Sequence, residues 1–142
     1  MSLICPTVLA SDPAGYKAQM ELAAGLGNRL QIDLMDGDFA EPRSVNLAQV
    51  WWPDEVKADI HLMYRRPAEQ LESLVSLKPN LVIIHAEADG NLVGVIEHLN
   101  KFDIKTGLAL LKTTTPDQAA DLIKLVDHVL IFSGDLGKFG GR

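Results

Sequence analysis

The sequence has a single cysteine, fewer basic than acidic side chains and no long apolar run. One cysteine excludes a disulfide within the chain and fits a reducing compartment, and we interpret Cys5 as a small buried residue of the first strand. No segment reaches the roughly 18 apolar residues of a membrane-spanning helix. The amino terminus also lacks the basic region and apolar core of a signal peptide. We therefore expect a cytoplasmic protein without a membrane partner.

The charge balance narrows the kinds of ligand. With 13 Lys and Arg against 19 Asp and Glu, the net charge is −6, which disfavours a nucleic-acid surface. It does not exclude a small phosphorylated ligand, because a few backbone amides or one cation can hold a phosphate. A chain of 142 residues that is 47% hydrophobic and 23% charged can bury a core. We expect a single domain over residues 1–142.

Short apolar runs alternate with stretches of helical periodicity along the whole chain. The runs cover residues 3–9, 30–35, 58–63, 81–85, 105–111 and 128–133. Helices are expected over 14–24, 68–77 and 91–102, after Thr115-Pro116-Asp117, and less regularly over 44–50. The runs start about 25 residues apart, which is the size of one strand–helix unit. This pattern predicts an α/β fold with parallel strands and right-handed crossovers.

The number of units bears on the architecture. A closed (β/α)8 TIM barrel needs eight units and at least about 200 residues, whereas six strands are predicted here. The last predicted strand leads into a glycine-rich segment, residues 134–141, that favours a following helix. We interpret the chain as an incomplete barrel of about six parallel β/α units, the amino-terminal portion of a larger barrel. A complete, open doubly wound sheet is the alternative.

Polar residues gather at the carboxyl ends of the runs: Asp33, Asp36, His61 and His85. In a β/α barrel this edge carries the active site, because the loops there converge on one mouth. The alternation in residues 30–35 places Gln31, Asp33 and Met35 on one face of their strand. We therefore expect Asp33 and His61 to emerge side by side at the same rim.

Six segments resemble motifs of the ribulose-phosphate 3-epimerase family. They are residues 5–10 (CPTVLA), 32–39 (IDLMDGDF), 59–63 (DIHLM), 85–88 (HAEA), 113–116 (TTTP) and 139–141 (FGG). The resemblance implies a TIM barrel that binds a phosphorylated sugar. It also implies an isomerase of the pentose phosphate pathway, which interconverts D-ribulose 5-phosphate and D-xylulose 5-phosphate by inverting C3.

Inversion next to a carbonyl explains the residue types. A proton leaves one face of the carbon and another arrives on the opposite face, so two acid/base groups must flank the substrate. The intermediate enediolate is negatively charged, and a divalent metal can stabilise it. By resemblance, Asp33 is the first catalytic acid/base, and Asp33 and His61 are metal ligands. The implied metal is Zn, Fe, Mn or Co.

The resemblance also implies a set of substrate-binding residues: Thr7, Met35, His61, Met63, His85, Gly140 and Gly141. The two methionines would line the pocket beside the enediolate. The hydroxyl of Thr7 would replace that of a serine in the family motif. The backbone amides of Gly140 and Gly141 would approach the phosphate, as suits an anion site made of amides.

Some positions depart from the family pattern. Gln31 stands where a second histidine ligand is expected, and a neutral amide is a weaker ligand than imidazole. Phe132 replaces a methionine, and the second catalytic aspartate belongs to a seventh strand. These departures leave two alternatives open: another sugar-phosphate isomerase, epimerase or lyase on the same barrel, or an inactive phosphosugar-binding protein. We expect little epimerase activity from this chain alone, and we expect a homo-oligomer because unpaired sheet edges favour association.

Overall fold

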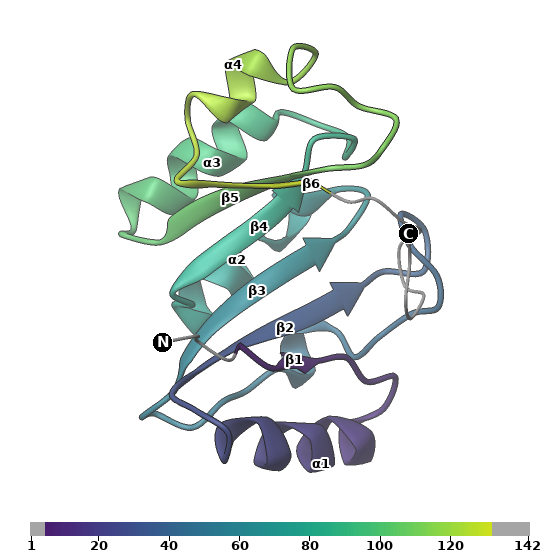
Figure 1. Cartoon of the computed structure of the whole chain (residues 1–142), viewed down its shortest axis with the longest axis vertical. Helices are drawn as coiled ribbons and strands as arrows, with labels where there is room; N and C mark the ends of the chain where they lie inside the picture. The colour runs from purple at the N-terminus through teal and green to yellow at the C-terminus, as the bar shows by residue number, and fades with distance from the viewer. Residues whose placement is uncertain (1–4, 132–142) are drawn as a thin grey trace.

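The computed structural model describes residues 5–131 and shows one sheet of six parallel strands in chain order (Figure 1). The strands are β1 (Thr7–Val8), β2 (Arg29–Met35), β3 (Lys57–Met63), β4 (Leu81–His85), β5 (Lys105–Leu110) and β6 (His128–Ile131). Each strand pairs in parallel with its neighbour. The predicted α/β architecture is therefore confirmed. The outer parts of the first and last predicted strands, residues 3–4 and 132–133, lie outside the described residues.

Helices connect the strands as the periodicity predicts. They are α1 (Pro13–Ala24), α2 (Leu71–Leu77), α3 (Leu92–Lys101) and α4 (Ala120–Ile123), with short 3-10 helices η1 (Leu47–Gln49) and η2 (Pro67–Gln70). Asp12 caps α1 by accepting a hydrogen bond from the amide of Gly15 at 2.7 Å, and Asn91 caps α3 in the same way. The helix expected after Thr115 is shorter than predicted, because turns occupy the residues before Ala120. No helix within residues 5–131 has the length and apolar character to cross a membrane.

The helix expected over residues 44–50 is wrong, because only η1 forms there. The backbone amide of Ser44 donates to the carbonyl oxygen of Met35, and the amide of Val45 donates to that of Ala10. The Ser44 hydroxyl also accepts from the Met35 amide at 2.8 Å. Further along, the amides of Gln49 and Val50 donate to the carbonyl oxygens of Asn46 and Leu47, three residues back, so this stretch makes the hydrogen bonds of a 3-10 helix and not those of an α-helix.

The two faces of the sheet differ in character. The face toward the helices carries the main core, built by alternate residues of the central strands: Leu30, Ile32, Leu34, Ile60, Leu62, Val82, Ile84 and Leu108. Each fully buried aliphatic side chain contributes about 1.5–3 kcal/mol of transfer free energy. The opposite face has only small apolar clusters, and it also carries the polar side chains of the candidate site. The alternation of side chains along the strands thus places the core on one face of the sheet and the candidate site residues on the other.

The two sheet edges are less well covered than the centre. All four residues of β6 are exposed, and Ile131 is 63% exposed. At the other edge Cys5 is also exposed, so our expectation of a buried cysteine is wrong. The physical reason is that Cys5 precedes the two paired residues of an edge strand.

Tyr16 links α1 to the connection between β2 and β3. Its side chain is buried, and its hydroxyl donates to the carbonyl oxygen of Trp51 and accepts from the Trp51 amide at 3.2 Å. The two rings also pack edge to face, with centroids 5.7 Å apart. Burial raises the pKa of Tyr16 to about 12, although the hydrogen bond to Trp51 opposes the shift. The neutral phenol is therefore part of the folded state.

We predict that Tyr16→Phe lowers the free energy of unfolding by about 1 kcal/mol at neutral pH, because two hydrogen bonds to Trp51 are lost. A pKa raised from 10 to about 12 means that the contribution is fully present below pH 10 and declines as the pH rises toward 12. Urea unfolding across this alkaline range should show a smaller loss in the variant than in the wild type. Identical pH profiles for the two proteins would contradict the assignment.

Candidate active site

The register of β2 on β3 brings the predicted site residues together. Asp33 lies opposite His61, and Met35 lies opposite Met63 on the adjacent strand. The Asp33 Oδ1 atom is 3.3 Å from His61 Nδ1, with the Asp33 side chain 17% exposed and that of His61 2% exposed. A carboxylate and an imidazole thus meet near the carboxyl ends of two neighbouring strands, where barrel enzymes place their chemistry.

The side chain of Gln31 also belongs to this group of site residues. Its side-chain amide donates to Asp33 Oδ1 at 2.8 Å. The same carboxylate oxygen therefore has both the amide of Gln31 and the imidazole of His61 beside it, and the two contacts fix its orientation. The family motif identifies Gln31 as a replaced histidine, whereas the strand alternation places it on the same face as Asp33. The hydrogen bond between the two side chains follows from this shared face.

His85 extends the group onto β4. Its Nε2 atom is 2.8 Å from Nε2 of His61, and the two rings stack with centroids 4.9 Å apart. Burial and, secondarily, the nearby His61 lower the pKa of His85 to about 3, so this imidazole is neutral at physiological pH. The Nδ1 atom of His85 lies 3.5 Å from Glu87 Oε1, and Glu87 Oε2 accepts from the Leu111 amide at 3.0 Å.

We call Gln31, Asp33, His61, His85 and Glu87 the polar array. It crosses three adjacent strands, and its two histidines are almost completely buried. In the sequence, Glu87 is recognisable only as part of the segment 85–88 (HAEA). Its contact with His85 depends on how the chain turns after β4. That contact was therefore not predictable from strand periodicity.

The remaining predicted residues fall into three groups. Met35 and Met63 are 3% and 2% exposed and form a small apolar cluster with Ala40 beside the polar array. Thr7 is exposed and pairs with Gln31, so it shares the face of Asp33 one strand away. Gly140, Gly141 and Phe132 lie outside the described residues.

The donors present do not fit a divalent metal ion. Asp33 Oδ1 accepts from Gln31, His61 Nδ1 faces that same oxygen, and His61 Nε2 faces His85. A metal bound by Asp33 and His61 would have to replace contacts that already use both imidazole nitrogens. Within residues 5–131 no three His, Cys, Asp or Glu side chains are arranged to hold an ion. These contacts do not support the predicted binding of a metal by Asp33 and His61.

Asp36 organises the turn after β2. Its Oδ1 atom accepts from the amides of Asp38 and Phe39, and Oδ2 accepts from the amide of Arg65 at 2.8 Å. Burial alone would raise the pKa of Asp36, but these backbone hydrogen bonds outweigh it and the pKa is lowered. Gly37 adopts φ +81°, a conformation that favours glycine. The turn places the ring of Phe39 5.0 Å from that of His85.

A parallel sheet whose strands follow one another in chain order, with the helix-side core on one face and the polar side chains on the other, is typical of the class of β/α-barrel proteins. The model of the Ribulose-phosphate 3 epimerase family matches residues 3–142, and the chain belongs to this family.

Curated relatives agree with this assignment at low identity. The ribulose-phosphate 3-epimerase of Chlamydia muridarum is 26% identical and is aligned over 99% of this chain and 63% of its own length. That of Helicobacter pylori strain 26695 is 27% identical, over 98% of this chain and 64% of its own. The ribulose-phosphate 3-epimerase of Bacillus subtilis is 24% identical and is aligned over 100% of this chain and 67% of its own length. The chain thus spans a little under two thirds of the length of the first two relatives.

We predict that Asp36→Asn destabilises the protein by about 1–3 kcal/mol at neutral pH, because an amide offers one acceptor oxygen to three backbone donors. Since the folded pKa of Asp36 is lowered, its contribution is present above the ordinary pKa and is lost as the pH falls through the lowered value. Urea unfolding should therefore show the two proteins converging in acid. Asp38→Asn is the matched control, because within residues 5–131 the Asp38 side chain makes an exposed ion pair of small energetic value and no other contact of this kind, while its backbone bonds stay unchanged. An equal loss of stability in the control would contradict the role of Asp36.

Proposed function

We propose that this chain supplies the first acid/base group of an epimerase that interconverts D-ribulose 5-phosphate and D-xylulose 5-phosphate. The observation that carries the proposal is the Asp33 carboxylate held between Gln31 and His61 at the carboxyl edge of the sheet. Membership of the family and the names of the relatives support the same substrate class.

Asp33 would act on the proton at C3 of the sugar. The C3–H bond breaks, the proton moves to an Asp33 carboxylate oxygen, and the electron pair forms the enediolate with the neighbouring carbonyl. The buried methionines Met35 and Met63 give this site a weakly polar wall, which strengthens electrostatic interactions there. Contacts of Thr7 and His85 with the sugar, and of Gly140 and Gly141 with its phosphate, are part of the proposal. No step is assigned to a metal, because the donors do not fit one.

Inversion also needs a second acid/base group, because one carboxylate cannot serve both faces of the same carbon. We therefore propose that the chain alone removes and returns a proton on one face and epimerises little or not at all. Exchange with solvent can then occur without inversion.

We predict that the wild-type chain in D2O incorporates deuterium at C3 of D-ribulose 5-phosphate, measured by loss of the C3 proton signal in NMR. Asp33→Asn should slow this exchange at least about a hundredfold, the usual effect of losing a general base. Asp38→Asn, an exposed carboxylate on the turn after β2, serves as the control and should exchange like the wild type. Absence of exchange in the wild type, or equal exchange in Asp33→Asn, would refute the role of Asp33. Epimerisation at a normal enzymatic rate would refute the need for a second base outside this chain.

Gln31 favours a second candidate function. Its amide occupies the carboxylate oxygen that a metal would use, so another sugar-phosphate reaction without a metal on the same barrel is consistent with the site. Loss of exchange on removing divalent ions with a chelator would argue against this candidate.

We also propose that the chain self-associates through β6, an edge strand whose Val129, Leu130 and Ile131 are 45%, 38% and 63% exposed. Unpaired, apolar strand edges favour pairing with another chain. We predict that Ile131→Lys reduces association in sedimentation velocity runs at several concentrations. Leu22→Lys is the control, because Leu22 is 70% exposed on α1 at the other end of the sheet (Figure 1). A monomeric wild type at every concentration would contradict the proposal.

A further inference from the structure

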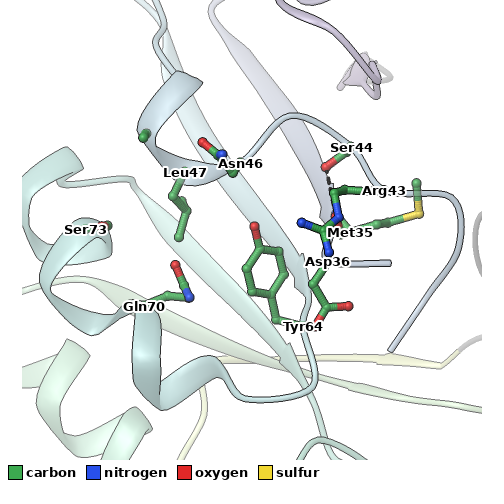
Figure 2. Close-up of a pocket in the computed structure, with 10 residues that line it drawn as sticks. Met35, Asp36, Arg43, Ser44, Asn46, Leu47, Tyr64, Gln70 and Ser73 are labelled. Carbon is green, nitrogen blue, oxygen red and sulfur yellow. Dashed lines mark hydrogen bonds between the residues drawn. The ribbon is translucent and has the colours of Figure 1, made fainter. Parts of the chain in front are cut away.

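A hollow lies beside the candidate active site, on the other face of the sheet. It has a volume of about 340 Å³ and is bordered by the ends of β2 and β3, by η1, by the end of η2 and by the first turn of α2 (Figure 2). Pockets of this size hold small organic molecules. Its walls are mixed, with Leu47 and Ala48 beside several polar side chains.

The strand alternation separates this hollow from the polar array. His61 and Met63 share one face of β3, so Tyr64 faces the other way and packs with the helix-side core. Tyr64 is 8% exposed, and Figure 2 shows its hydroxyl turned into the hollow. A ligand there would not occupy the space next to Asp33.

Three hydrogen-bonding side chains converge on the hollow: Arg43, Tyr64 and Gln70. Within the part of the chain that the structure describes, none of the three makes a side-chain hydrogen bond or ion pair. Tyr64 is protonated at physiological pH, because burial and the charge of Asp36 raise its pKa while Arg43 opposes the shift. It can therefore donate a hydrogen bond to a ligand.

The position of Arg43 depends on Gly37. A Cβ atom at residue 37 would lie 3.3 Å from Nε and 3.4 Å from Cβ of Arg43, so the missing side chain allows the arginine to lie against the turn. The Asp36 carboxylate nearby accepts three backbone hydrogen bonds and makes no ion pair with Arg43. The guanidinium group is thus available to an anion, and its fork matches a carboxylate in a bidentate manner.

The charges select a monoanion. Arg43 supplies the positive charge, and Asp36 also lines the hollow, so a phosphate dianion would meet more repulsion from the Asp36 carboxylate than a monoanion would. The amide of Gln70 and the side chains of Asn46 and Ser73 line the rest of the hollow and suit hydroxyl groups. We propose that this hollow binds a small hydroxylated carboxylate, whose carboxylate group pairs with Arg43 and the Tyr64 hydroxyl.

Isothermal titration of the full 142-residue chain with sodium gluconate tests the proposal. Sorbitol is the matched neutral polyol, and inorganic phosphate is the alternative anion, all at constant ionic strength. We expect saturable gluconate binding that Arg43→Gln weakens by more than about tenfold and Tyr64→Phe by roughly threefold or more, as expected for losing a charge-assisted and a neutral hydrogen bond. Arg66→Gln, an exposed arginine that follows β3 and does not line the hollow, should leave the affinity within about twofold of the wild type, because it removes a positive charge without removing a contact to the ligand.

Several outcomes would overturn the proposal: no saturable gluconate binding, equal binding of sorbitol, or unchanged binding by a folded Arg43→Gln variant. Tighter binding of phosphate than of gluconate would overturn the assigned ligand class. If circular dichroism shows that Arg43→Gln is unfolded, the titration is repeated with Arg43→Lys, which keeps the charge and loses the bidentate fork. Unchanged gluconate binding by this folded variant would then overturn the proposal. These readouts are independent of Asp33 and of sugar-phosphate turnover.

Discussion

The parallel pairing of β2 with β3 is the constraint on which the rest of the structure depends. It runs over seven residues of each strand and places Asp33 beside His61. A slip of one residue would turn one of these side chains toward the helix layer. The register is fixed at the amino end as well, where Asp59 accepts from Asn80 at 2.9 Å and lies 2.7 Å from an Arg29 nitrogen. The contact between Arg29 and Asp59 thus lies at the amino end of the β2–β3 pair, and the contact between Asp33 and His61 lies toward its carboxyl end.

The polar array links three strands through side chains that face one another. His61 lies between Asp33 and His85, with its Nδ1 atom 3.3 Å from Asp33 Oδ1 and its Nε2 atom 2.8 Å from Nε2 of His85. Two imidazole nitrogens at this distance need one proton between them, so one ring donates and the other accepts. Burial keeps the imidazole of His85 neutral, with a pKa lowered to about 3. These contacts orient His61 toward Asp33 before any substrate is present.

The parts of the fold that follow from local periodicity were predictable, and the parts that follow from tertiary competition were not. Alternation in β2 placed Asp33 correctly, and Asp12-Pro13 located the start of α1. The region around Ser44 has a helical pattern, but its backbone groups bond to strand ends that are distant in sequence. Cys5 is exposed because it lies at the edge of the sheet, and its place at the edge does not follow from the local sequence pattern. The bond from Gln31 to Asp33 shows that a departure from a family motif can still be part of the site.

The turn after β2 belongs to both faces of the sheet. Asp36 holds its backbone, Phe39 leaves it on the side of His85, and Arg43 returns across Gly37 on the helix side. The guanidinium carbon of Arg65 also lies 5.3 Å from the centre of the Phe39 ring, so β3 is tied to the same turn. The same short segment therefore contributes a residue to each wall, Phe39 beside His85 and Arg43 at the hollow. The two sites share a structural element although they share no ligand space.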